Sequence, residues 1–126
     1  MHSSTTWREK NTNMNNKNKL IYLAGIVDGE GHFCRPRNKN GQGRTFKQSR
    51  LIVENLSKNL IYWIKENFGG GVDMHFRDRV KHPTWQDIYR WTISGKKCEE
   101  LAVRLQPYLI VKKEQVKRVL PEFYKV

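Results

Sequence analysis

The chain has 126 residues, enough for one domain with its own core, and carries 24 lysines and arginines against 12 aspartates and glutamates. Its net charge of +12 attracts polyanions, so the expected partner is nucleic acid. A membrane is excluded, because no apolar run approaches the roughly 18 residues that a membrane helix needs. Cys34 and Cys98 stand outside any Cys-x-x-Cys or Cys/His pattern, which indicates unpaired thiols in a reducing compartment, not a secreted protein or a zinc site.

The first 18 residues, MHSSTTWREKNTNMNNKN, hold almost no apolar side chains. They are predicted to form a flexible basic tail, followed by one domain over residues 19–126. Such a tail is either simply disordered or follows DNA phosphates. Its Ser, Thr and Arg content is that of a transit peptide, but the amphipathic pattern is missing, so no targeting signal is assigned.

Residues 23–31 read LAGIVDGEG, an apolar helical stretch that ends on two acids. Gly25 and Gly29 fall four residues apart, one above the other, and small residues at that spacing let two helix backbones approach closely. The helix is predicted to end near Glu30, because Gly29 and Gly31 are poor helix formers and glycine suits a C-terminal cap.

Asp28 and Glu30 therefore lie where a helix stops, although the partial negative charge of a helix C-terminus disfavours carboxylates. A bound cation would make sense of this placement. Backbone carbonyls and a carboxylate are hard oxygen ligands, the kind that Mg²⁺ accepts while keeping waters and a substrate phosphate oxygen. The alternative is that both acids are solvated turn residues, and this motif alone does not decide between the two.

The next segment is predicted to form two strands and a helix. HFCRPR at 32–37 is the first strand, NKNGQGR at 38–44 is the hairpin turn, and TFKQSRLIVEN at 45–55 is the second strand. Ser57 is the predicted N-cap of a helix that runs to about Phe68.

The pattern then repeats in outline. VDMHFRDR at 72–79 and QDIYRWTIS at 86–94 alternate apolar with polar residues, as half-buried strands do. KKCEELAVRLQPYL at 96–109 is predicted to be a helix broken near Pro107, and a final short helix starts at about Lys112. The predicted order is α-β-β-α-β-β-α-α, with helices on one side of the sheet only.

An antiparallel sheet covered on one side leaves its other face for solvent or a ligand. Arginine can bind guanine bidentately, and a β-ribbon fits the major groove, so the polar residues of this face are predicted to bind DNA. They are Gln48, Arg50, His75, Arg77, Arg79, Arg90 and Arg37. The alternative is an ordinary solvated face, with His75 and Trp85 capping the sheet edge, but the high net charge favours DNA.

LAGIVDGEG resembles the signature of the LAGLIDADG homing endonucleases. The Leu-Ala-Gly opening, Asp28 and Gly31 are kept, Ile26 and Val27 are conservative replacements, and Glu30 replaces the second aspartate of the signature. The similarity extends over nearly all of the chain after residue 18. It implies an α+β fold of order αββαββα, with an antiparallel sheet that has helices on one face and DNA on the other.

The resemblance also implies roles for site residues. Glu30 and the carbonyl of Gly29 would hold Mg²⁺, in a site that Mn²⁺ or Ca²⁺ can also occupy. LQPYLIVKK at 105–113 resembles a second, weaker family signature, by which Lys112 is the basic catalytic group. Asn55 corresponds to a polar residue, commonly glutamine, that positions solvent near the metal. Asp28 is expected to serve helix packing and the turn.

A single signature copy implies a homodimer whose signature helices pack on the two-fold axis through Leu23, Gly25, Ile26 and Gly29. Two identical subunits predict a roughly palindromic double-stranded DNA target, cut on both strands. Two alternatives stay open: a maturase that binds its intron RNA, and a DNA-binding protein that has lost cleavage. The expected location is an organelle or the cytoplasm of a prokaryote or phage.

Overall fold

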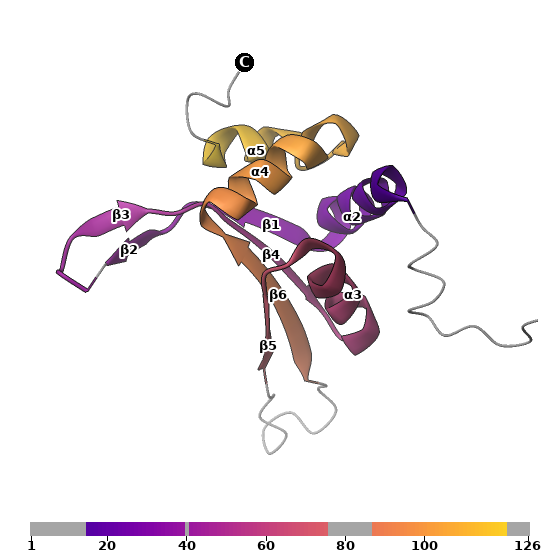
Figure 1. Ribbon diagram of the computed structural model, residues 1–126, viewed down its shortest axis with the longest axis horizontal. Coiled ribbons are helices and arrows are strands. Elements are labelled where there is room, and N and C mark those ends of the chain that lie inside the picture. Colours follow the sequence, from indigo (N-terminus) through magenta and orange to yellow (C-terminus); the bar gives the residue numbers. More distant parts are fainter. Residues whose placement is uncertain (1–14, 40, 76–86, 121–126) are drawn as a thin grey trace, which may run out of the picture.

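The computed structural model describes residues 15–39, 41–75 and 87–120. Its main sheet is antiparallel, with strands in the order β1 (Gly31–Cys34), β4 (Arg50–Asn55), β6 (Ile88–Ser94) and β5 (Gly71–His75). Within these ranges, four α-helices and one 3-10 helix pack with it: α2 (Asn16–Glu30), α3 (Lys58–Phe68), α4 (Gly95–Leu105), η1 (Gln106–Tyr108) and α5 (Lys113–Val119). These helices leave one side of the sheet open (Figure 1). The predicted α+β class and the αββαββα order are confirmed.

Alternation within the central strands sets which face is buried, as predicted. Leu51 and Val53 in β4 and Trp91 and Ile93 in β6 are buried against the helices, while the residues between them are half-buried or exposed. The indole of Trp91 is fixed because its Nε1–H donates to the carbonyl of Gly69 at 2.7 Å. The sheet therefore presents its intervening polar residues on the open face.

The turn before β5 depends on a glycine. Gly70 has a φ of +83°, and a Cβ at this position would lie 2.6 Å from the carbonyl oxygen of Thr92. A side chain is excluded by both the backbone conformation and the space, so glycine is needed where α3 meets the sheet.

The helix starts follow ordinary capping chemistry. Ser57 caps α3 as predicted, because its hydroxyl accepts from the backbone N–H of Leu60 at 3.3 Å. Asn15 caps α2 in the same way, accepting from Asn18 N–H at 2.8 Å. The predicted tail of 18 residues is therefore too long, since residues 16–18 belong to α2; residues 1–14 lie outside the described part of the chain.

The first predicted strand pair is interrupted. The segments expected as continuous strands at 32–37 and 45–55 each break, and their outer parts, β2 (Arg37–Lys39) and β3 (Thr45–Lys47), form a separate two-stranded sheet. This hairpin projects away from the main sheet (Figure 1). Pro36 has no N–H for the main ladder, and Ser49 is buried with its carbonyl accepting from Gly95 N–H at 2.8 Å. Both features end the pairing there.

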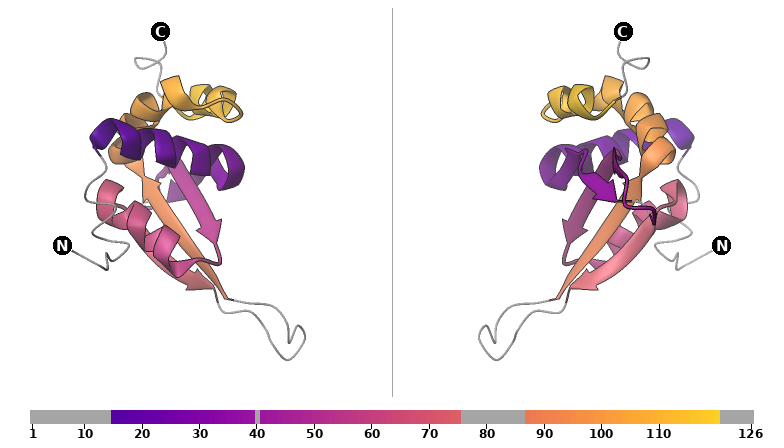
Figure 2. Two further views of the ribbon diagram at one scale, coloured as in Figure 1. Left: turned by 90° about the vertical axis from the view of Figure 1, so that its right-hand side faces the viewer. Right: turned by 90° about the vertical axis from the view of Figure 1, so that its left-hand side faces the viewer.

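Figure 2 shows α2 running between α3 and the α4–α5 pair, with its outward side uncovered. No helix in the described ranges is both long and apolar enough to cross a membrane. The end of α2 leads directly into β1, so its last turn lies at the edge of the sheet.

Candidate nuclease site at the end of helix α2

Helix α2 has two apolar sides with different environments. Leu23, Ala24 and Val27 are fully buried in the core, whereas Ile21 and Tyr22 are 43% and 51% exposed. The sequence predicted Leu23 at a dimer interface. This assignment is wrong, because the Leu23 side chain is fully buried in the core of its own subunit. The i, i+1, i+4 spacing of the buried residues turns them toward the sheet and leaves the opposite side free.

Gly25 and Gly29 lie on the exposed side of α2. A Cβ added at either glycine would meet nothing within 4 Å among the described residues. Each glycine costs a helix about 1 kcal/mol relative to alanine. No contact within the described residues accounts for that cost.

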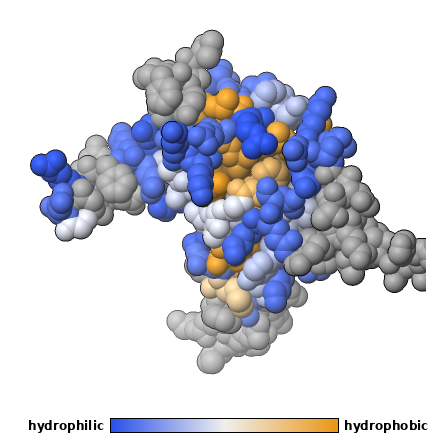
Figure 3. Space-filling view, viewed as in Figure 1, coloured by the Kyte–Doolittle hydropathy of each residue, from blue (hydrophilic) through white to orange (hydrophobic). Residues whose placement is uncertain are grey.

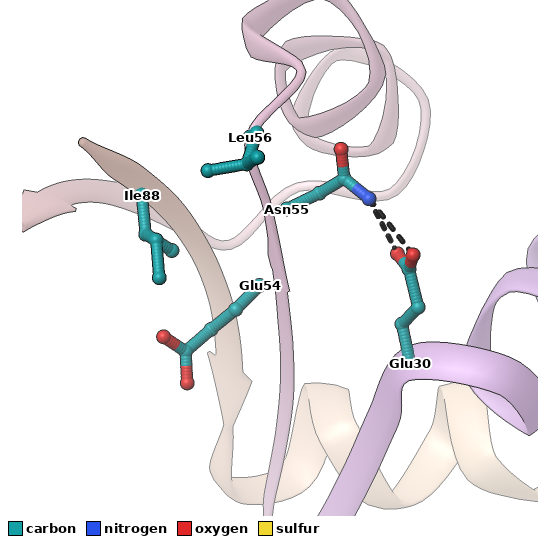
Figure 4. Close-up of a pocket in the computed structure, with 5 residues that line it drawn as sticks. All are labelled: Glu30, Glu54, Asn55, Leu56 and Ile88. Atoms are coloured by element: carbon teal, nitrogen blue, oxygen red, sulfur yellow. Dashed lines mark hydrogen bonds between the residues drawn. The ribbon is translucent and has the colours of Figure 1, made fainter. Parts of the chain in front are cut away.

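Glu30 and Asn55 meet at the junction of α2 and the sheet. The Nδ2 amino group of Asn55 donates to both carboxylate oxygens of Glu30, at 2.9 and 2.7 Å (Figure 4). The amide orientation is determined by its other end, where Oδ1 accepts from the backbone N–H of Ser57 at 2.7 Å. Two residues 25 positions apart in sequence are therefore brought together, as the predicted site requires.

A cavity of about 340 Å³ opens beside this pair. It is lined by Glu30, Glu54, Asn55, Leu56 and Ile88, which come from the ends of α2 and β4, the start of β6 and the loop before α3 (Figure 4). The sequence did not assign Glu54 to the site. It indicated Arg50 of the same strand, and a single acid within a strand matches no functional motif. Glu30 and Glu54 thus both line the cavity, and Figure 4 shows the Glu54 side chain pointing away from the Glu30–Asn55 pair.

Asp28 ties the C-terminal segment to α2. Its carboxylate accepts from the backbone N–H groups of Ile110, Val111 and Lys112 at 2.8, 3.0 and 2.9 Å. Burial raises the pKa of Asp28, but these three hydrogen bonds and the charge of Lys112 outweigh it, so the pKa is lowered from its ordinary value of 3.8. Asp28 lies two residues before Glu30 in α2. It therefore fixes the backbone of Lys112 near the end of the helix that carries Glu30.

The donors at this helix end fit a hard cation. No three His, Cys, Asp or Glu side chains gather into a ligand set within the residues described. The Glu30 carboxylate is exposed, and the Gly29 carbonyl belongs to the last turn, where the helix supplies no partner. Mg²⁺ needs only one or two protein oxygens when waters and a substrate phosphate complete its shell.

The open face of the sheet carries both signs of charge. Arg50 and Arg90 lie on it as predicted, and both are half-buried. Arg90 Nη2 lies 3.5 Å from Glu54 Oε2. Gln48 differs from the prediction, because it lies in the break between β3 and β4, with Nε2 3.2 Å from where a Cβ of Gly95 would lie.

Four other predicted DNA-binding residues are less fully described. Arg77 and Arg79 lie outside the described residues, as does Trp85. Only the backbone is described for Arg37, in β2, and for His75, at the end of β5. Their assignment to DNA stays a prediction from the sequence.

Exposed apolar side chains also lie along the outer side of α2 and near its C-terminal end. Ile110 and Val111, on the segment held by Asp28, are 87% and 68% exposed. A groove of about 470 Å³ runs along the helix itself, lined by Ile21, Tyr22, Gly25, Ile26, Glu30 and Leu60. Figure 3 shows, on the face viewed there, apolar surface bordered by hydrophilic side chains. The sequence assigned Ile110 and Val111 no role, because two adjacent apolar residues form no functional motif.

No family model matches the chain. A curated protein, the intron-encoded RNA maturase bI4 of Saccharomyces cerevisiae, is 32% identical over 53 residues, which cover 42% of this chain and 7% of the maturase. The homology therefore extends over a small part of that longer protein.

Solved structures match over most of this chain. Homing endonuclease I-CvuI, in complex with the I-CreI target, superimposes with a TM-score of 0.62 at 21% identity, covering 81% of this chain and 63% of that one. The archaeal intron-encoded homing endonuclease I-Vdi141I, complexed with DNA, gives 0.59 at 18% identity, covering 82% and 65%.

The LAGLIDADG meganuclease I-CpaMI, bound to uncleaved DNA, gives a TM-score of 0.52 at 18% identity, covering 75% of this chain and 33% of that one. The chain thus spans less than two thirds of each of these three proteins. The order of the elements, the antiparallel sheet and these superpositions agree on one architecture, and the chain has the LAGLIDADG homing endonuclease fold.

Proposed function

We propose that this protein is a metal-dependent homing endonuclease that cuts both strands of a long, roughly palindromic DNA target as a homodimer. The observation that carries the proposal is the contact of Glu30 with Asn55 at the end of α2, where Asp28 also holds the Lys112 segment. Glu30, Asn55 and the backbone of Lys112 thereby lie at one helix end, which supports a shared role in phosphodiester hydrolysis. Homologous folds in complex with DNA support the substrate class.

The chemistry follows from these groups. A bound divalent cation supplies polarisation of the phosphate and a water of lowered pKa. Glu30 and the Gly29 carbonyl would hold Mg²⁺, with Mn²⁺ or Ca²⁺ as possible substitutes. Asn55 orients the Glu30 carboxylate, as a hydrogen-bonding partner of a metal ligand does. The ammonium of Lys112 neutralises charge that develops on the phosphoryl oxygens.

The homodimer is supported by the outer side of α2. Gly25 and Gly29 have no packing role within the described residues, and the groove beside them is lined mainly by apolar side chains. Ile26, half-buried in that groove, stays in the proposed interface, while Ile21 and Tyr22 replace Leu23. A second copy of α2 would bring two Glu30 carboxylates to a common axis, one for each DNA strand.

Cleavage of a plasmid that carries the intronless allele of the host gene tests the proposal. Purified protein is incubated with this plasmid and Mg²⁺, Mn²⁺ or EDTA, beside the variant Glu30→Gln. We expect linear product with the metals, none with EDTA, and none with Glu30→Gln although that variant still binds the plasmid. Wild-type protein that binds the site but never cuts it, with either metal, would overturn the proposal.

A second candidate function is intron RNA binding as a maturase. It is favoured by one observation, the 32% identity to an intron-encoded RNA maturase. Splicing of the host intron in vitro, with and without the protein, tests it. If wild type and Glu30→Gln both accelerate splicing, the protein is a maturase. If the protein leaves the splicing rate unchanged, the maturase function is refuted.

A further inference from the structure

The middle of the open sheet face holds an arginine between two acids. Arg90 in β6 pairs with Glu54 in β4 on one side and with Asp73 in β5 on the other. Directly opposed residues of antiparallel strands extend from the same face and lie side by side. The described part of this face is therefore not uniformly basic, and Arg90 is matched by two carboxylates.

These carboxylates are unexpected on a DNA-binding face. A carboxylate near phosphates weakens binding to any sequence, since it adds repulsion to a contact that charge attraction drives. Fold stability accounts for little of the Glu54–Arg90 pair, because a partly exposed ion pair at 3.5 Å contributes little. The Arg90 and Glu54 side chains are 33% and 43% exposed, so both can still reach a ligand.

The two side chains carry complementary hydrogen-bonding groups. Arginine donates to O6 and N7 of guanine, and glutamate accepts from the N4 amino group of cytosine. Arg90 Nη2 lies 3.5 Å from Glu54 Oε2, so the donors of the guanidinium and the acceptors of the carboxylate lie side by side. The acceptors of guanine and the amino group of cytosine lie side by side in the same way within one base pair. Burial of Arg90 Nε, which has no hydrogen-bond partner in the described residues, limits the motion of the guanidinium.

We propose that Glu54 and Arg90 together read one G·C base pair in each half of the target, Arg90 contacting guanine and Glu54 contacting cytosine. The inference rests on the proposed function, because it assumes a DNA target. Glu54 shares a cavity with Glu30 and Asn55 (Figure 4), so this base pair lies at the inner end of each half-site, nearest the cut.

The test is selection of bound sequences from a randomised double-stranded DNA library, in Ca²⁺, followed by sequencing. The wild type is compared with Glu54→Gln, Glu54→Asp and Arg90→Lys. The matched control is Glu100→Gln, which removes the same charge from the exposed side of α4, on the helix-covered side of the sheet. Thermal melting verifies that each variant is folded.

We expect the wild type to select G·C at one symmetric inner position. Glu54→Gln removes the negative charge of the acceptor, so it should lower the preference there by roughly 5- to 150-fold, the usual range for one well-formed base contact, and leave other positions unchanged. The same variant should bind non-specific DNA more tightly than wild type, because a repulsive charge is gone. Glu54→Asp should keep part of the preference for G·C, and Arg90→Lys should lose the preference for guanine. Glu100→Gln should have the same base preference as wild type.

Several results would overturn the inference. They are an unchanged base preference in Glu54→Gln, a Glu54-dependent position that is A·T, and the failure of wild type to select any sequence. Cutting of the selected target in Mg²⁺ is scored separately. If the protein cuts the selected target but Glu54→Gln has the same base preference as wild type, only this inference is refuted. If the base preference depends on Glu54 but the target is not cut, only the endonuclease proposal is refuted.

Discussion

Asp28 lies at a helix end that disfavours carboxylates, yet it accepts three backbone hydrogen bonds there. The sequence indicated two acids at the end of α2 and left both a metal role and a solvent role open. The structure separates them. Asp28 is satisfied by residues 110–112 of the same chain, and Glu30, held only by Asn55 among the described residues, stays exposed to a cation and a substrate.

The first prediction concerns Asp28→Asn. An amide keeps the shape but loses the charge and one acceptor, so we expect a loss of about 1–3 kcal/mol of unfolding free energy near neutral pH. The folded pKa of Asp28 is lowered, so its stabilisation is present above the ordinary value of 3.8 and is lost as the pH falls through the folded value. Urea unfolding of wild type and variant at neutral and acidic pH measures this. A difference that stays constant into acid would contradict it.

A second prediction at this scale concerns Asn55→Ala. Partners of a metal ligand typically contribute 10- to 100-fold to metal affinity or activity, so single-turnover cleavage should slow by about that factor and need more Mg²⁺. Asn67→Ala is the matched control, because the Asn67 amide donates to Trp63 O in α3, away from the site. Equal rates for Asn55→Ala and wild type would remove Asn55 from the site.

At the scale of elements, α2 combines two tasks on opposite sides. Its inner residues pack on the sheet, and its outer glycines face a groove. The apolar stretch predicted the helix, and Gly29 and Gly31 predicted its end near Glu30, but neither showed which apolar residues face inward. Leu23 and Ile26 are both apolar, and only the packing of the sheet against one side separates the buried residue from the half-exposed one.

Gly25→Leu tests the outer side of α2. Leucine favours the helix by several tenths of a kcal/mol or more over glycine and meets nothing within the described subunit, so subunit stability should rise or stay constant. The same side chain should keep two helices apart, so light scattering should report a 15.0 kDa monomer for the variant and a mass twice as large for the wild type, which we propose to be a dimer. Val103→Leu, at an exposed site on α4, is the control. If Gly25→Leu is still a dimer, the dimer interface does not include the outer side of α2.

The strands show a limit of pattern reading. Alternation identified the buried face of β4 and β6 correctly, because a period of two is a local property. The sequence did not predict the break of the first strand pair into β2 and β3, since it depends not only on Pro36 but also on the contact of Ser49 with Gly95, 46 positions later in the chain (95 minus 49). Contacts over such separations leave no periodic signal.

At the scale of the whole molecule, the net charge of +12 is the dominant property. A protein that contacts six to ten phosphates typically loses on the order of 10³–10⁵ in affinity between 50 and 200 mM salt. We expect a loss of about this size for non-specific DNA, measured by fluorescence anisotropy over a salt series. An affinity that hardly changes with salt would contradict a phosphate-tracking role for this charge.

The sequence by itself determined the element order, the end of α2 at Glu30 and the basic character of the chain, because periodicity, capping and charge are local or additive properties. Only the tertiary structure decided that Asn55 contacts Glu30, that Asp28 holds the Lys112 segment, and that Leu23 is buried within its own subunit. It also placed Glu54 beside Arg90. Each of these depends on strands and helices far apart in the chain meeting at one edge or face of a sheet, which no local pattern encodes.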